Sequence, residues 1–436
     1  MNLENIKNKT VQMILQFSIP SIIAMVLTSL ITIVDGFFIG NYVGKEGIAA
    51  VNLGLPIVYV YLGFGIMFGV GGIAIAGIAL GAQDIKKSNN VFNQTVISSI
   101  IVSVILSIFI CIFMGSIIRA VNIDAQVGIY FDKYYSIMIL AYPIMIVNST
   151  LGMFIRGEGK PHLFMLINIL TVISNICLDY YFIKILRFGI KGIALASLIS
   201  LIIGLFSMIL FFLKKSSIYK IRKFQFSKQV LRDTVLNGSS EFIGQMSMSI
   251  SMFAYNWVIM KNVGVEGVAA FTIVGYIAYL FSMVIVGFGQ GASPLISFSY
   301  GAKEFELSKT IRKITNIFVF LSGVVVMIIL FIASDWYSNA FVRSESVVAL
   351  IRSGLSIFMF SFLFSGINTI TSFYFTSIGK AKESAIISLS RGLVVLLICI
   401  FTLPTLFGMT GVWLVAPVTE AITIVLSIMF IRVNEK

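Results

Sequence analysis

Gly44-Lys45-Glu46-Gly47-Ile48-Ala49-Ala50 returns 220 residues later as Gly264-Val265-Glu266-Gly267-Val268-Ala269-Ala270. The same offset relates Gly81-Ala82 to Gly301-Ala302. A constant offset of this kind indicates an internal duplication. The sequence therefore predicts two copies of one structural half.

The composition of the 436-residue chain is that of an integral membrane protein, with 58% hydrophobic and 11% charged residues. Runs such as 96–118 carry no charge over about 20 residues, which is enough to cross the bilayer core. The first apolar run, 11–39, lacks a small-residue cleavage site and is interpreted as a retained span. No segment is long and polar enough to form a soluble domain.

Each half is predicted to contain six membrane helices. The predicted ranges are 11–39, 46–80, 92–118, 128–156, 162–185 and 190–213, then 233–262, 266–300, 310–334, 346–378, 383–406 and 410–432. Because six is even, the halves have the same sidedness and form parallel repeats. We expect an N-terminal lobe (1–213), a basic connection (214–232) and a C-terminal lobe (233–436).

Basic residues predict the orientation in the membrane. Most of the 31 Lys and Arg residues fall on the side of the N-terminus, with a dense group between Lys214 and Arg232. By the positive-inside rule, both termini and the connection are cytoplasmic. The net charge of +13 lies in loops beside spans, so it does not indicate a nucleic-acid partner. The connection itself is interpreted as a solvated charge run.

A few charged residues are predicted to lie within the membrane, and they are the candidates for function. They are Asp35, Asp179, Glu241, Arg391 and Glu420. Each costs about 2.5 kcal/mol or more on insertion scales, so each is expected to face a cavity or a partner.

The first half contains a candidate cation site. Asn175 and Asp179 are four residues apart on one face of the fifth span, and Asp35 is in the first. A hydroxyl of Ser197 or Ser200 could complete the group. Two carboxylates at close range need either a proton or a hard cation such as Na⁺, so Na⁺ at Asp35, Asn175 and Asp179 is one of two alternatives. The competing interpretation is that these groups only hydrogen-bond neighbouring helices.

The second half does not repeat this cluster. At the 220-residue offset Asp35 becomes Tyr255, and Asn175 and Asp179 become Val395 and Cys399. Arg391 and Glu420 are predicted to form a structural ion pair. Glu241 has no evident partner, so Glu241 and Tyr255 are the candidates for contact with a cationic substrate.

The sequence shows no signature of an enzyme or a cofactor site. Gly159-Lys160 and Gly379-Lys380 lack the rest of a phosphate loop, and His162 is the only histidine. The three cysteines show no metal-binding spacing and are interpreted as small core residues. Transport driven by an ion gradient remains the expected activity.

Several motifs together resemble bacterial multidrug and toxic compound extrusion transporters. They are Val34-Asp35-Gly36 followed by 44–50, Arg156-Gly157-Glu158-Gly159-Lys160, Asn175 to Asp179, and Ser390-Arg391 followed by Leu403-Pro404, Phe407-Gly408, Gly411, Trp413, Pro417 and Glu420. The resemblance covers essentially the full chain. It implies an all-α fold of twelve transmembrane helices, with two six-helix bundles forming a V around a central cavity.

The resemblance also implies a function. In that family, influx of H⁺ or Na⁺ drives efflux of mostly cationic, amphipathic drugs, and Asp35, Asn175, Asp179 and Ser197 match the cation site of the N-terminal lobe. Some members carry further acids in the C-terminal lobe, but here the tenth span has no acid after Glu345. The chain is expected in the bacterial inner membrane, among lipids and as a monomer.

Two alternatives to this cation-coupled multidrug antiporter remain open. A lipid-linked oligosaccharide flippase of the same superfamily needs several cationic residues to hold pyrophosphate, whereas only Arg391 lies within a span. A scaffold or receptor that does not transport leaves the buried aspartates unexplained.

Overall fold

The computed structural model describes residues 3–120, 125–341 and 344–434, and the secondary structure of these residues is helical. The helices of the first half are α1 (Leu3–Asn8), α2 (Thr10–Tyr42), α3 (Lys45–Leu53), α4 (Leu55–Gly81), α5 (Ile85–Ala120), α6 (Ala125–Gly157), α7 (Pro161–Tyr180), the π-helix η1 (Tyr181–Ile185) and α8 (Ile190–Lys214). Those of the second half are α9 (Lys228–Asn262), α10 (Val265–Gly301), α11 (Phe305–Phe341), α12 (Glu345–Phe358), α13 (Ser361–Ser377), α14 (Ala381–Leu389), the π-helix η2 (Ser390–Val394) and α15 (Val395–Asn434).

The repeated stretch forms the same turn in both halves. Gly44 has a φ of 101° and Gly264 a φ of 86°, and each directly precedes a helix. These values are open to glycine at little cost and strained for other residues. The duplication has therefore kept the residues that set the backbone path between the first two spans of each half.

The spans agree with the predicted ranges except where helices are broken. Among the described residues, nine helices are long and apolar enough to cross a membrane, or ten if α12 and α13, bent by 49°, form one span. In addition, Gly408 (φ 57°, ψ −135°) breaks α15 into two helices, and the 35-residue α9 is long enough to span but more polar. With these two added, the segments are the twelve expected. The second and tenth spans, predicted as continuous, are broken at Gly54 and at residues 359–360.

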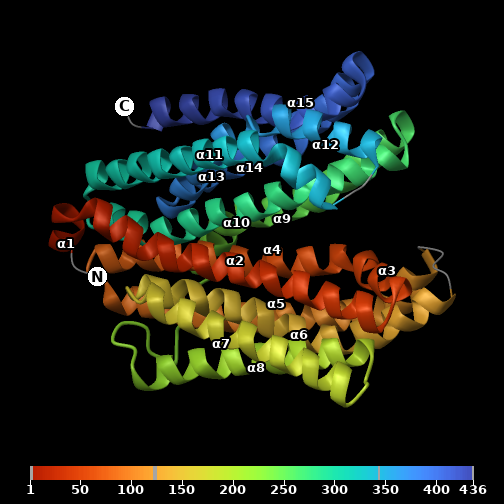
Figure 1. Cartoon of the computed structure of the whole chain (residues 1–436). Coiled ribbons are helices and arrows are strands. Elements are labelled where there is room, and N and C mark those ends of the chain that lie inside the picture. The colour runs from red at the N-terminus through yellow and green to blue at the C-terminus, as the bar shows by residue number, and fades with distance from the viewer. Residues whose placement is uncertain (1–2, 121–124, 342–343, 435–436) are drawn as a thin grey trace.

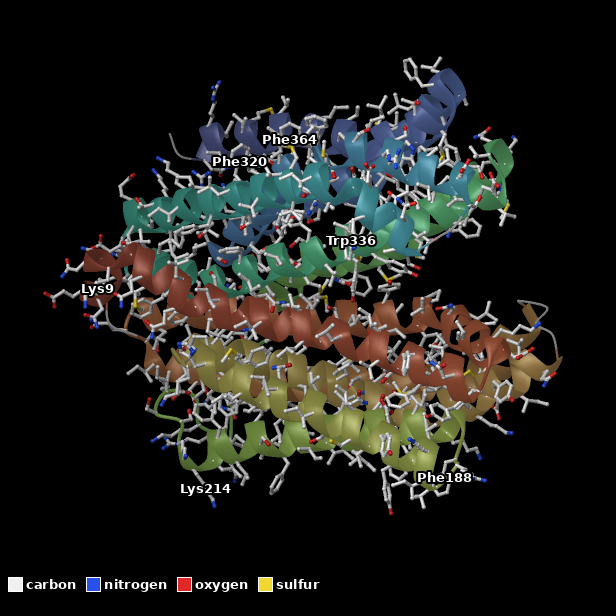
Figure 2. The ribbon with its side chains drawn as sticks, in the orientation of Figure 1. Lys9, Phe188, Lys214, Phe320, Trp336 and Phe364 are labelled. Carbon is white, nitrogen blue, oxygen red and sulfur yellow. The ribbon has the colours of Figure 1, made fainter. Side chains whose placement is uncertain are left out.

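The two halves form the arms of a V. Helices α2–α8 lie in one group and α9–α15 in the other, and the groups meet at one end and diverge at the other (Figure 1). Contacts between the halves are made mainly by α4 with α9 and by α2 with α10. Lys9 and Lys214 lie toward the joined end and Phe188 toward the open end (Figure 2).

Glycines bring the halves together at the joined end. A Cβ on Gly71 of α4 would lie 2.1 Å from the carbonyl oxygen of Thr234 in α9, and a Cβ on Gly291 of α10 would lie 2.6 Å from Cα of Ser18 in α2. Gly71 and Gly291 are 220 residues apart, so these are the same contact made twice. We call this contact the glycine seam.

The basic side chains of the connection are exposed, as expected of a solvated charge run, but its backbone is packed against the first half. Tyr219 is fully buried, and its ring centroid lies 5.1 Å from that of Phe154 and 5.4 Å from that of Phe92. Glu158 accepts hydrogen bonds from Ser216 Oγ at 2.6 Å and from the amide of Ile218 at 3.1 Å. The start of the connection is therefore packed into the first half.

Four amide side chains on the first turns of α5 hold the rest of the connection. Gln94 accepts from the amide of Ser227 at 3.0 Å and donates to its carbonyl oxygen at 2.8 Å. Asn90 makes the same pair of bonds with Gln225, at 2.8 and 3.0 Å. The other bonds join Asn93 to Lys220 and Arg222, and Asn89 to Lys220. We call these residues the amide ladder, and α9 begins at Lys228, directly after its last bond.

The cysteines are only partly as expected. All three are free, and Cys399 is buried, but Cys111 and Cys177 are exposed on the helix surface. The expectation that these two are core residues was wrong. Apolar residues cover a membrane protein's lipid face as well as its core, so an apolar run does not tell which of the two a residue faces.

Candidate cation site and the charged network of the second half

Helices α2, α7 and α8 bring the four predicted cation-site residues of the first half together. Asn175 and Asp179 are fully buried on one face of α7. Ser197 Oγ of α8 donates to Asp35 Oδ2 of α2 at 3.4 Å, and Asn175 Nδ2 donates to Ser197 Oγ at 3.5 Å. Both distances are at the long limit of hydrogen bonding, so these bonds are weak.

In the described part of the chain, four carboxyl and amide oxygens of this group lack donors. Among the described residues, Asp35 Oδ1, Asn175 Oδ1 and both carboxylate oxygens of Asp179 are buried without a hydrogen-bond partner. Asp35 and Asp179 are close enough for each carboxyl group to affect the charge of the other. Buried polar groups are nearly always partnered in folded proteins. Oxygen acceptors without hydrogen-bond donors are suited to bind a proton or a hard cation such as Na⁺.

Two neighbouring features were not predicted. Tyr134 of α6, 5% exposed, is close enough to both aspartates to interact electrostatically. The π-helix η1 begins two residues after Asp179, and π turns are frequent at functional sites. Of the two candidate serines, only Ser197 bonds Asp35, since Ser200 Oγ donates to the carbonyl oxygen of Ser197.

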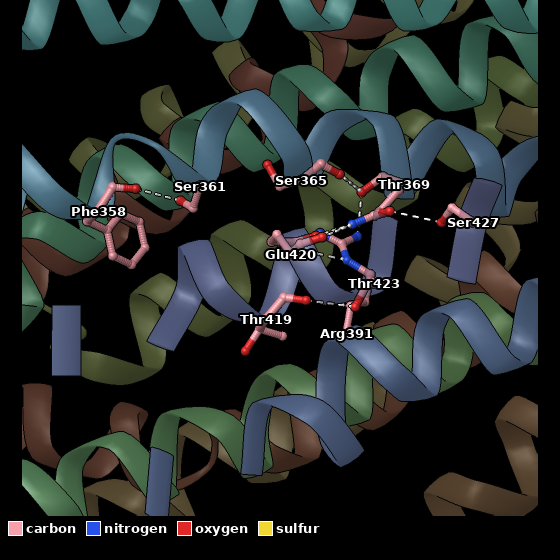
Figure 3. A network of polar contacts seen from close by, with 10 residues as sticks. Phe358, Ser361, Ser365, Thr369, Arg391, Thr419, Glu420, Thr423 and Ser427 are labelled. Atoms are coloured by element: carbon pink, nitrogen blue, oxygen red, sulfur yellow. Dashed lines mark hydrogen bonds and ion pairs between the residues drawn. The ribbon is translucent and has the colours of Figure 1, made fainter. Parts of the chain in front are cut away.

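The second half holds a satisfied charged network in place of these acids. Arg391 Nη2 lies 2.6 Å from Glu420 Oε1 and Nε lies 3.2 Å from the same oxygen, while Nη1 donates to Thr369 (Figure 3). Asn368 Nδ2 donates to Glu420 Oε2 at 2.8 Å, and Ser427 Oγ donates to Asn368 Oδ1 at 2.9 Å. The pair predicted from the sequence thus lies within a larger set of bonds.

The two substrate-contact candidates are not alike. Tyr255 is 6% exposed in a core cluster, with its ring 4.5 Å from that of Phe271. Glu241 of α9 is partly exposed and lies within electrostatic range of Arg391. Contact of either residue with a substrate stays a prediction.

Comparison with known proteins identifies the family. The family model MatE matches residues 20–181 and 242–401, which is one match in each half. The chain belongs to the MatE family. A MatE protein is a membrane transporter and not an enzyme, and the two separate matches agree with the duplication visible in the sequence.

Similar sequences include multidrug export proteins of staphylococci. The chain is 26% identical over 400 residues to the multidrug export protein MepA of Staphylococcus haemolyticus, covering 91% of this chain and 88% of that protein. It is 25% identical over 431 residues to MepA of Staphylococcus saprophyticus, covering 98% and 95%.

Solved MatE structures share the fold over nearly the whole chain. A multidrug resistance transporter of the family in an outward-facing conformation has a TM-score of 0.92 at 25% identity, covering 97% of this chain and 95% of that one. A transporter of the same superfamily from Pyrococcus furiosus, with a binding pocket of reversed polarity that suggests a different function, has a TM-score of 0.90 at 26% identity, covering 97% and 96%. The all-helical, V-shaped fold is therefore confirmed.

Proposed function

We propose that the protein is a cation-coupled antiporter that exports amphipathic, mostly cationic drugs by alternating access. Asp35, Asn175, Asp179 and Ser197 bind the coupling ion, H⁺ or Na⁺. The observation that carries the proposal is the set of buried oxygens without donors, shared by two carboxyl groups in the membrane. The names of the staphylococcal relatives, multidrug export proteins, support the choice of substrate class.

Such a site can convert an ion gradient into work. An empty pair of buried carboxylates repels itself, and a bound cation removes that repulsion. Moving one charge through about 100 mV releases about 2.3 kcal/mol, which is available to drive a change in the arrangement of the halves. The cation is then needed for one conformation and released in the other, which couples its movement to that of the drug.

Placement of the chain in a bacterial cell membrane, with both termini in the cytoplasm, belongs to the same proposal. The described chain begins and ends at the joined end of the V, where the connection also lies (Figure 1). This end carries most of the basic residues, as the positive-inside rule requires of a cytoplasmic face. We propose that a single chain suffices for transport.

A flippase that holds pyrophosphate is less well supported. Arg391, the basic residue predicted within a span, directs its guanidinium at Glu420 and Thr369. Its charge is therefore matched inside the second half. A phosphate-binding cavity needs cationic groups that are free to meet the ligand.

Dye efflux from inverted membrane vesicles tests the proposal. A Na⁺ jump or a pH jump drives dye movement by the wild-type protein, and Asp35→Asn and Asp179→Asn reduce that movement to background because the ion site has lost a carboxylate. Asp132→Asn, an exposed acid of the same half, serves as the control and retains wild-type rates. Wild-type dye movement by both site variants, at equal protein levels, would refute the proposal.

A further inference from the structure

The two halves differ in whether their buried acids have bonded partners. In the first half, both oxygens of Asp179 lack a partner among the described residues. In the second half, Glu420 Oε1 accepts from Arg391 and Oε2 accepts from Asn368. One half thus carries negative charge that needs a cation from outside, and the other supplies a cation from its own chain.

The duplication places these two sites at related positions. Arg391 is four residues before Val395, the equivalent of Asn175, and Glu420 is three residues after Pro417, the equivalent of Ser197. Each is therefore about one helical turn from the position that carries a cation-site residue in the first half. A retained residue supports the match, because Asn148 and Asn368 are 220 residues apart. Asn148 donates to the carbonyl oxygen of Leu201 in α8 at 3.0 Å, and Asn368 to that of Glu420 in α15 at 2.9 Å.

The π-helix η2 fixes the position of the guanidinium. Arg391 is its second residue, and the next residue, Gly392, lies so close to α9 that a Cβ on it would be 2.5 Å from Cβ of Ser247. Ser251 Oγ of α9 donates to the carbonyl oxygen of Gly392 at 2.9 Å. The charged groups around Arg391 are Glu420 from α15 and Glu241 from α9, while Thr369 and Asn368 of α13 are neutral.

We propose that Arg391 acts as a tethered cation in the second half, occupying the place that a mobile coupling ion takes in the first. Arg391 then determines ion stoichiometry, because it leaves one mobile-cation site per chain. The assignment of the mobile site to Asp35 and Asp179 rests on the proposed function. Exclusion of a cation from Glu420 by Arg391 does not rest on the proposed function and is tested separately.

The test removes the tethered cation and asks whether a mobile one replaces it. In Arg391→Gln, the Glu420 carboxylate is left without its counter-ion, so the variant gains stability from Na⁺ or from protons. The melting temperature of the purified protein is measured with and without Na⁺ and across pH. The increase in melting temperature caused by added Na⁺ or by lower pH is larger in Arg391→Gln than in the wild type. The matched controls are Arg391→Lys, which keeps a tethered charge, and the double variant Arg391→Gln/Glu420→Gln, which needs none. Both show the wild-type ion response.

An Arg391→Gln protein that folds with the wild-type ion response overturns the proposal, as does an enhanced response that persists in the double variant. Repeating the comparison in an Asp35→Asn/Asp179→Asn background separates the two proposals. In that background the enhanced ion-dependent stabilisation of Arg391→Gln remains, whether or not the first half holds the coupling ion.

If Arg391→Gln does not fold, equilibrium binding of Na⁺ and proton uptake are measured on the wild-type protein instead. One cation bound per chain supports the tethered cation, and two overturn it.

Discussion

At the residue scale, the surroundings of Asp179 disfavour a negative charge. Both of its oxygens are buried without a donor among the described residues, and Asp35 is close enough to repel it. A group so placed lowers the stability of the ion-free protein, as a proposed ion ligand would. Binding sites commonly trade stability for function in this way.

Asp179→Asn is therefore expected to stabilise the protein while it abolishes transport. The amide removes one of two crowded charges and adds a donor facing Asp35, which is worth about 1–3 kcal/mol for a buried unsatisfied group. The melting temperature in Na⁺-free buffer at alkaline pH measures the gain. Asp132→Asn, an exposed change of the same kind, leaves it unaltered. A lower melting temperature for Asp179→Asn would show that the carboxylate is already compensated.

Ser197→Ala is expected to have a smaller effect than either aspartate change. Its bonds to Asp35 and Asn175, at 3.4 and 3.5 Å, are long, and the hydroxyl carries no charge. Loss of one weak ligand raises the ion concentration needed for half-maximal dye efflux and leaves the maximal rate nearly unchanged. Ser207→Ala is the matched control, since its hydroxyl bonds only the carbonyl oxygen of Ile203 one turn earlier in α8. An equal shift in both variants would exclude a role for Ser197 in the site.

The sequence was sufficient to predict which residues of the first half converge, but not all of them. Asp35, Asn175 and Asp179 are rare polar residues in apolar runs, so membrane cost and helical spacing single them out. Tyr134 has no such signal, because it lies among other tyrosines of α6 that pack as core. Tyr255 is buried in a core cluster, which the sequence did not indicate, since a single sequence does not show which side of a helix faces a cavity.

At the element scale, the connection shows where a local pattern fails. A cluster of lysines and arginines is usually a solvated run, and here the side chains do carry that charge outward. The backbone is nevertheless held by partners far away in the sequence, such as Gln94 for Ser227 and Asn90 for Gln225. A single sequence gives no sign of such pairing, since neither segment is unusual by itself.

The amide ladder is expected to protect the connection from trypsin. Cleavage after Lys220, Arg222 or Lys223 requires the backbone to leave α5. Asn93→Ala combined with Gln94→Ala removes four bonds to this backbone, each worth about 0.5–1.5 kcal/mol, so cleavage at these sites accelerates by about tenfold or more. Limited proteolysis followed by mass spectrometry measures the rate. Asn168→Ala is the control, because its amide bonds only its own helix. Equal rates in both variants would mean that the ladder does not restrain the connection.

At the scale of the whole molecule, the duplication and the apolar runs sufficed to predict two six-helix arms. They did not predict the breaks at Gly54 and at residues 359–360, since a glycine in an apolar run serves packing as often as it serves a bend. The break at Gly408 does lie between the predicted spans 383–406 and 410–432. The conformational state is also not given by overall similarity. Family structures called bent and straight have TM-scores of 0.91 and 0.92, nearly equal to that of the outward-facing one.

The glycine seam requires the halves to touch at their joined end. A Cβ on Gly71 would lie 2.1 Å from a backbone oxygen of α9, which cannot move away as a side chain does. Gly71→Ala therefore separates the halves there at an expected cost of about 1–3 kcal/mol, which is about a 5- to 150-fold change in the ratio of the two states.

A cysteine at Ser297, fully buried near Gly77 at the same end, reports that separation in a protein without its three natural cysteines. Gly71→Ala increases its reaction rate with a membrane-impermeant maleimide added on the side of the termini, and slows dye efflux because one state is disfavoured. Gly275→Ala, where a Cβ meets nothing within 4 Å, is the matched control and changes neither rate. Unchanged labelling in Gly71→Ala would mean that the contact of α4 with α9 does not hold this end closed.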